Sequence, residues 1–131
     1  MSSAELLGDA FGRINSLVHH GVDGLTLEQL TFTPDPDANS ISWLIWHLTR
    51  IEDDHIAGVA DIEQVWLSSQ WRVRFDLPFE PTATGYGHGA SEVAAVVVDA
   101  ERLVGYQDAV YEQTRRFVGG LQESDLPRIV D

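Results

Sequence analysis

The chain has 131 residues, 44% of them hydrophobic, which suits one domain with a single core. Its formal net charge is −13, and the chain contains arginine but no lysine. Phosphates and anionic surfaces repel so acidic a chain, which argues against nucleic-acid and membrane partners. No cysteine is present, so disulfides and a protein thiol nucleophile are excluded.

No apolar run approaches the roughly 20 residues that span a bilayer. The N-terminus lacks the basic and apolar regions of a secretory signal. We therefore expect a cytoplasmic protein with one domain over residues 1–131.

Residues 3 to 23 are predicted to form a first long helix, because apolar residues recur there at three- and four-residue spacing. Ser2 or Ser3 can cap its start. His19 and His20 lie in its last turn. Adjacent helical residues point about 100° apart, so the two histidines cannot face one site, and we expect them at the surface.

Thr26 and Gln29 match a capping box and predict a short helical turn at residues 27 to 30. Pro34 and Pro36 then impose an extended connector. A second long helix should run from residue 41 to about 60, with Asn39 or Ser40 as its N-cap.

This second helix is strongly apolar and carries two histidines. Helical phase places one set of residues on a predicted core stripe: Ile41, Leu44, Ile45, Leu48, Ile51, Glu52, His55, Ile56 and Val59. His47 falls on the flank of that stripe, beside Trp43.

His47 and His55 are eight residues apart, or about 12 Å along a helix axis. Metal–nitrogen bonds are about 2 Å long, so one regular helix does not bring both to one ion. If His47 binds a metal, most other ligands must come from another helix. The alternative is that His47 is a core histidine with a hydrogen-bond partner.

A weaker helical turn is predicted at residues 62–67, and residues 68 to 90 then show no clear period. The many aromatic residues indicate a packed crossover along one end of the bundle, which could also serve as a lid near His47. Trp71 to Phe75 alternate like a strand but are too few to predict a sheet. The glycines at 85, 87 and 89 suggest a tight turn, from which His88 either reaches a site or has a structural role.

A third long helix is predicted from residue 92 to about 118, capped by Ser91 and ended by Gly119 and Gly120. Its acidic residues Asp99, Glu101, Asp108 and Glu112 are expected mostly at the surface. Three long helices with so wide an apolar surface leave one stripe uncovered. A fourth helix or a partner chain is the usual cover.

Several stretches together resemble the DinB superfamily, in particular an actinobacterial branch related to mycothiol-dependent maleylpyruvate isomerase. They are Asn39-Ser40-Ile41, Trp43-Leu44, Trp46-His47-Leu48, Arg50, Glu52-Asp53-Asp54-His55, Gly85-Tyr86-Gly87-His88, Leu103-Val104-Gly105-Tyr106 and Asp108-Ala109-Val110. The resemblance implies an all-α, up-down-down-up four-helix bundle. It also implies a divalent metal, zinc or nickel, bound by three side chains, and His47 matches the first ligand.

The chain departs from this family pattern at the other two ligands, which the family takes from a later helix. No histidine follows His88. We therefore expect a C-terminally truncated bundle, with the fourth helix missing or supplied by a partner chain, for instance in a homodimer.

Two functional hypotheses follow from the family resemblance and from the two missing metal ligands. One is a metal-dependent transferase or isomerase that uses a low-molecular-weight thiol such as mycothiol or bacillithiol, with Glu52 or Asp54 orienting His47 or a bound water. The other is a non-enzymatic, dimeric helical binding or stress-response module without a complete metal site.

Overall fold

The computed structural model describes residues 2–127 and is helical throughout, with no strand in that part of the chain. Three long helices, α1 (Ser3–Val22), α3 (Ile41–Ala60) and α7 (Ala100–Gly119), form the body of the fold. Four short helices and a 3₁₀ turn join them: α2 (Leu27–Thr31), α4 (Val65–Ser68), α5 (Trp71–Phe75), α6 (Ala90–Ala95) and η1 (Glu123–Asp125). The all-α class is confirmed. Residues 128–131, at the end of the segment expected to lead into a fourth helix, lie outside the described part.

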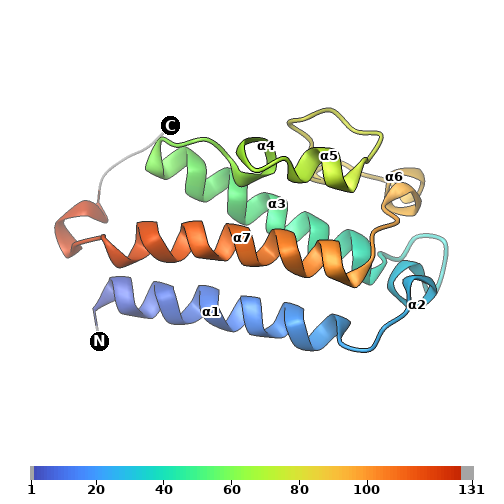
Figure 1. The fold of residues 1–131 in the computed structure, drawn as a ribbon, viewed down its shortest axis with the longest axis horizontal. Helices are drawn as coiled ribbons and strands as arrows, with labels where there is room; N and C mark the ends of the chain where they lie inside the picture. The colour runs from blue at the N-terminus through green and yellow to red at the C-terminus, as the bar shows by residue number, and fades with distance from the viewer. Residues whose placement is uncertain (1, 128–131) are drawn as a thin grey trace.

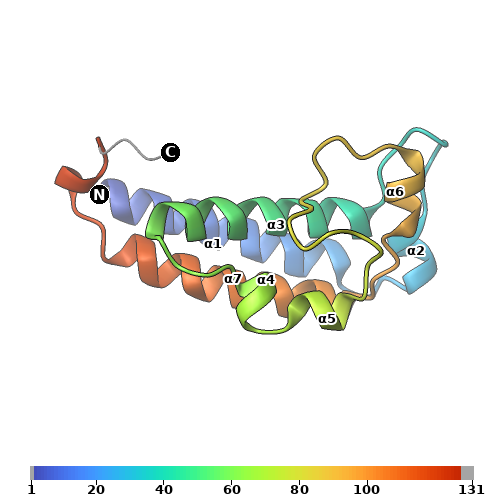
Figure 2. The ribbon, with the colours of Figure 1, turned by 90° about the horizontal axis from the view of Figure 1, so that it is seen from above.

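The long helices are arranged around α7, which packs against both α1 and α3, while α1 and α3 hardly touch each other. Figures 1 and 2 show that α3 and α7 run in the same direction, opposite to α1. Two parallel neighbours need a long return connection, and residues 61–99 provide it. No fourth long helix is present among residues 2–127.

Side-chain caps set the starts of the helices largely as predicted. Ser2 accepts a hydrogen bond from the backbone N–H of Glu5, and Ser40 accepts one from that of Trp43. Thr26 and Gln29 form the expected capping box. In each case a side-chain oxygen satisfies a backbone donor that the first helical turn leaves free.

The prediction of one continuous helix from residue 92 to 118 is wrong. The helix is interrupted at residues 96–99, between α6 and α7. Three consecutive valines occupy this break, and such β-branched residues lose rotamer freedom in a helix. The Ser42 hydroxyl donates to the Val98 carbonyl at 3.1 Å and accepts from the Val98 N–H at 3.2 Å. Asp99 then caps α7, and Gly89, not Ser91, caps α6.

The predicted core stripe of α3 is only partly correct, because Ile45 and Glu52 are buried but other members of the stripe are half-buried or exposed. The side chain of His55 is 70% exposed, and Leu44 is 43% exposed. The face of α3 toward α7 instead buries Ser42, Thr49, Arg50 and Asp53. Periodicity identifies an apolar face, but it does not show which face packs inward when the polar residues on the other face bond to one another.

The exposed apolar face of α3 forms one wall of a groove, and α1 forms the other. Two hollows, of about 400 and 230 Å³, share Ile14 and Leu48 and together make up this α1–α3 groove. No α7 residue lines it. Its lining residues are Phe11, Ile14, Leu17, Val18, Gly21, Ile41, Leu44, Ile45, Leu48, Ile51, Glu52, His55 and Ile56. Among residues 2–127, this groove is the uncovered stripe expected from the helix count.

The crossover packs, as predicted: α4 and α5 lie along the flank of α7, and the loop that follows them leads to α6 at the end of the bundle where α3 and α7 begin (Figure 2). Trp66 of α4 and Phe75 of α5 are buried, and their rings meet edge to face. Residues 71–75, which alternate like a strand, form a helix. The predicted turn at 62–67 begins later, at Val65.

Candidate functional site

His47 lies where α3 meets the end of the crossover. Its ring stacks on Trp43, with ring centroids 4.7 Å apart, and its Nδ1 hydrogen bonds to the Thr84 carbonyl. A carbonyl oxygen only accepts, so Nδ1 carries the proton. In the neutral ring, Nε2 is then left with a free lone pair. Metal-binding histidines often show this arrangement, in which the distal nitrogen is fixed by a backbone carbonyl.

The loop reaches His47 only because residue 85 is glycine. The backbone φ of Gly85 is +100°, a value that residues with a side chain rarely adopt. A Cβ atom there would lie 2.5 Å from His47 Nδ1 and 3.0 Å from the Trp43 ring. The tight turn predicted from the glycines is confirmed, and its position decides how closely Thr84 approaches the imidazole.

His88 adjoins His47 but has the opposite tautomer. Trp43 Nε1 donates to His88 Nδ1 at 3.2 Å, so the proton of the neutral His88 ring is on Nε2. The ring also stacks on Trp46 and contacts Phe79. Burial is the main reason that the pKa of His88 lies below its usual value. These contacts favour the structural role for His88 over a ligand role.

The other histidines are dispersed. His19 is paired with Asp108 of α7 at 2.7 Å, and His20 Nδ1 bonds to the Ser16 carbonyl. His55 is 4.0 Å from Asp54 at the surface. Within residues 2–127, no three His, Cys, Asp or Glu side chains are grouped so as to hold a metal ion. The described residues alone therefore do not fit the three-ligand site that the resemblance implies.

A buried polar network, not identified from the sequence, holds the crossover against α3 close to the two histidines. Arg50 is fully buried and donates to the carbonyls of Ala83 at 3.0 Å and Pro81 at 3.4 Å. It also donates to the Gln64 side chain at 2.7 Å. Since Ala83 precedes Thr84, Arg50 helps to position the carbonyl that fixes His47.

Asp53 is the anionic centre of this network. Its carboxylate accepts hydrogen bonds from the backbone N–H groups of Val65 and Trp66, and from the Tyr106 hydroxyl at 2.6 Å. Arg50 lies 3.8 Å away. Burial, followed by the nearby Asp53 charge, raises the pKa of Tyr106, so its hydroxyl stays protonated as a donor. The i, i+3 spacing of Arg50 and Asp53 was the available signal, but nothing in the sequence showed that this pair faces inward.

Glu52 and Asp54, the two candidate orienting groups, point elsewhere. Asp54 accepts from the Gln64 amide at 2.9 Å. Glu52 is 7% exposed and accepts from the Thr114 hydroxyl of α7 at 2.7 Å. Burial is the main cause that raises the pKa of Glu52. Neither carboxylate makes a hydrogen bond to His47 in the described part of the chain.

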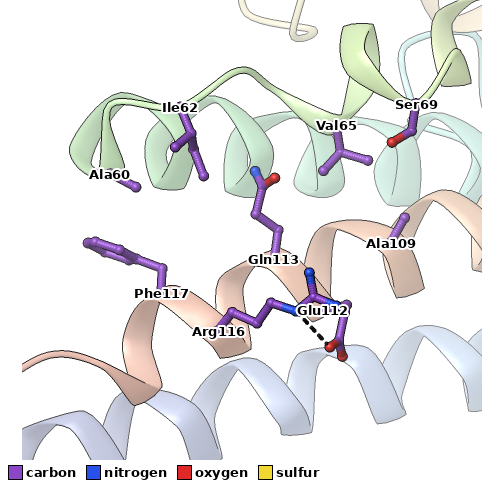
Figure 3. Close-up of a pocket in the computed structure, with 9 residues that line it drawn as sticks. All are labelled: Ala60, Ile62, Val65, Ser69, Ala109, Glu112, Gln113, Arg116 and Phe117. Carbon is purple, nitrogen blue, oxygen red and sulfur yellow. Dashed lines mark hydrogen bonds and ion pairs between the residues drawn. The ribbon is translucent and has the colours of Figure 1, made fainter.

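A separate cavity of about 500 Å³ lies between the end of α3, the link to α4 and α7 (Figure 3). Gln113 extends into it, and the Nε2 atom of Gln113 is buried without a partner. Arg116 and Glu112 form an ion pair at 3.1 Å beside it. It shares no lining residue with the α1–α3 groove or with the His47 surroundings.

Within residues 2–127, these features define a bundle of long helices with an open apolar groove and with His47 of α3 beside His88 of the packed crossover. The chain belongs to the DinB superfamily, whose family model matches residues 11–131. It is similar in structure to a conserved protein from Enterococcus faecalis, with a TM-score of 0.91 and 25% sequence identity. That match covers 100% of this chain and 78% of the other.

No curated protein matches the chain. None of the helices within residues 2–127 is both long and apolar enough to cross a membrane.

Proposed function

We propose that this protein is a DinB-type binding module whose α1–α3 groove accepts one amphipathic helix of a partner protein. The observation that carries this proposal is the exposed apolar lining of the groove. Leu17 is 69% exposed and Leu44 is 43% exposed, and both line the same hollow. Contiguous apolar surface of this kind marks interaction sites in soluble proteins.

The shape of the groove favours a helix as its occupant. On α3 the lining runs from Ile41 to Ile56, which spans about 23 Å at the rise of a helix. A helix of about 15 residues has that length and presents a stripe of apolar side chains at i, i+3, i+4 and i+7.

A labelled synthetic amphipathic helix of about 15 residues, matched to the groove in length, tests the proposal by fluorescence anisotropy, with a scrambled peptide as control. Leu44→Asp places a charge in the groove and should weaken binding at least tenfold. Leu67→Asp is the matched control, because Leu67 is 40% exposed on α4 and does not line the groove. Equal binding by both variants, or no binding by the parent, would overturn the proposal.

The homodimer expected from the sequence is the competing arrangement, in which a second copy covers the groove. Sedimentation equilibrium of the parent and Leu44→Asp chains separates the two. A parent dimer that Leu44→Asp dissociates and Leu67→Asp does not would replace the partner helix by a second copy.

The second candidate function is the metal- and thiol-dependent transferase or isomerase activity, located in the cytoplasm. The hydrogen bond from His47 Nδ1 to Thr84 favours it, because that bond leaves Nε2 available to zinc or nickel. The remaining ligands would come from outside residues 2–127 or from a second copy. A bound metal would lower the pKa of a small thiol such as mycothiol or bacillithiol.

Metal content of the purified chain after supply of zinc or nickel tests this candidate, with His47→Ala and His20→Ala compared. Near-stoichiometric metal that only His47→Ala abolishes would support it. Absence of metal from the parent would remove it for this chain.

A further inference from the structure

We propose that the cavity between the end of α3 and α7 binds a small monocarboxylate with an apolar body, and that Arg116 holds the carboxylate. The juxtaposition that points to it is an arginine with unused donors beside a largely apolar cavity of about 500 Å³. That volume lies within the range of about 300–1,000 Å³ typical of small-molecule sites. The cavity shares no lining residue with the α1–α3 groove, so this inference is independent of the helix-binding function proposed above.

The walls of the cavity are largely apolar. Figure 3 shows Ile62 and Val65 on one side, and Ala109 and Phe117 of α7 on the other. The buried network fixes one of these walls, because the backbone N–H of Val65 donates to the Asp53 carboxylate at 2.9 Å. Ile62 is exposed, so its apolar side chain is available to a ligand. A ligand that covers it gains the free energy of removing apolar surface from water.

The charged part of the lining belongs to a cluster of ion pairs in which one cation is in excess. The Glu112 carboxylate accepts hydrogen bonds from Arg115 at 2.7 and 3.2 Å, and from the Nε atom of Arg116 at 3.1 Å. The side-chain hydrogen bond from Arg115 is the main cause that lowers the pKa of Glu112, so this carboxylate stays ionised. Two guanidinium groups on one carboxylate leave one positive charge uncompensated.

Arg116 is the member of this cluster that supplies the cation to the cavity. It lines the cavity, its side chain is 75% exposed, and its Nη1 and Nη2 atoms make no hydrogen bond within residues 2–127. Arg115 instead lines a separate surface hollow beside the start of α1. The planar guanidinium group presents paired N–H donors that match the two oxygens of a carboxylate.

The charges around the cavity restrict the ligand to a single anionic group. Glu112 also lines the cavity, and the chain carries a net charge of −13, so a second anionic group on the ligand would be repelled. A phosphate monoester carries more negative charge than a carboxylate and is disfavoured for that reason. The apolar walls favour an aromatic or branched aliphatic body over a polar one.

Cinnamate and its neutral analogue cinnamyl alcohol test the inference, in titrations followed by the amide chemical shifts of isotope-labelled protein. The parent is compared with Arg116→Gln, Arg13→Gln and Ala60→Leu. Arg13→Gln is the matched control, because the Arg13 side chain is 77% exposed, forms an i,i+4 pair with Asp9 and lies outside the cavity. Ala60→Leu introduces a larger side chain into the lining. Circular dichroism confirms that each variant is folded.

Cinnamate should bind the parent more tightly than cinnamyl alcohol by about fivefold, the upper range for an exposed ion pair, and should shift the amides of Ile62 and Phe117. Arg116→Gln should reduce this preference to about twofold or less, and Arg13→Gln should leave it unchanged. Ala60→Leu should weaken the binding of both ligands.

Equal binding of the acid and the alcohol by the parent, or no binding of cinnamate, would overturn the inference. The same holds if Arg13→Gln reduces the preference as much as Arg116→Gln does, because the preference would then reflect net charge alone. Binding that Ala60→Leu leaves unchanged would also overturn it, because the ligand would then lie elsewhere on the protein.

Discussion

Removal of the Asp53 carboxylate should destabilise the protein far more than removal of its neighbour Asp54. Asp53→Ala deprives the buried Arg50 of its nearby anion, and it leaves three donors, two backbone N–H groups of α4 and the Tyr106 hydroxyl, without an acceptor. Breaking a buried charge pair typically costs about 3–5 kcal/mol. Asp54→Ala removes one hydrogen bond of a partly exposed side chain, worth about 1 kcal/mol or less.

Urea unfolding followed by tryptophan fluorescence measures both variants. With an m value of about 2 kcal/mol per M, Asp53→Ala should lower the unfolding midpoint by about 1.5–2.5 M and Asp54→Ala by about 0.5 M or less. If the two midpoints differ by less than about 0.5 M at equal m, Asp53 is not the centre of the network and the account given for the crossover is wrong.

Two further predictions concern the histidine pair. Gly85→Ala should lower the free energy of unfolding by about 2 kcal/mol or more, because φ is positive there and the added Cβ would clash with His47. Gly87→Ala also has a positive φ but open space around its Cβ, so it should lower that free energy by about 1 kcal/mol. Urea unfolding midpoints compare the two variants, and equal losses of stability would contradict the close approach of Gly85 to His47. Because the folded-state pKa of His88 is lowered, the stability that depends on neutral His88 is present above about pH 6.5 and is lost as the pH falls through the folded pKa. His88→Gln should therefore show a smaller loss between pH 7.5 and 5.5 in matched urea titrations, and an unchanged loss would exclude the Trp43–His88 hydrogen bond as its source.

The sequence predicted the long helices where propensity, caps and period agreed, as in α1 and α3. It missed the break before α7 because the 3.6-residue period continues through the three valines. What stops the helix is a contact with Ser42, 56 residues away from Val98 in the chain, which no local pattern contains.

The site was predictable only where a residue type carried the signal by itself. His47 could be singled out because imidazole is a common ligand. The hydrogen bond of His47 to Thr84 could not be predicted, because it depends on the position that the long crossover takes in the folded protein. The burial of Arg50 and Asp53 was not predicted, since charged side chains are seldom fully buried unless paired, and most of their partners lie on other elements.

The packing of α1 on α7, and scarcely on α3, has a consequence for synthesis of the chain. Residues 23–99 separate the two helices, so α1 leaves the ribosome long before α7 does. At about 5–20 residues per second, it waits roughly 4–16 s for its main packing partner. During that interval its apolar face is bare, so the nascent chain is a natural client for chaperones that hold amphipathic segments. Ribosome-bound chains of increasing length, probed by limited proteolysis, should show α1 becoming protected only after residue 119 has emerged.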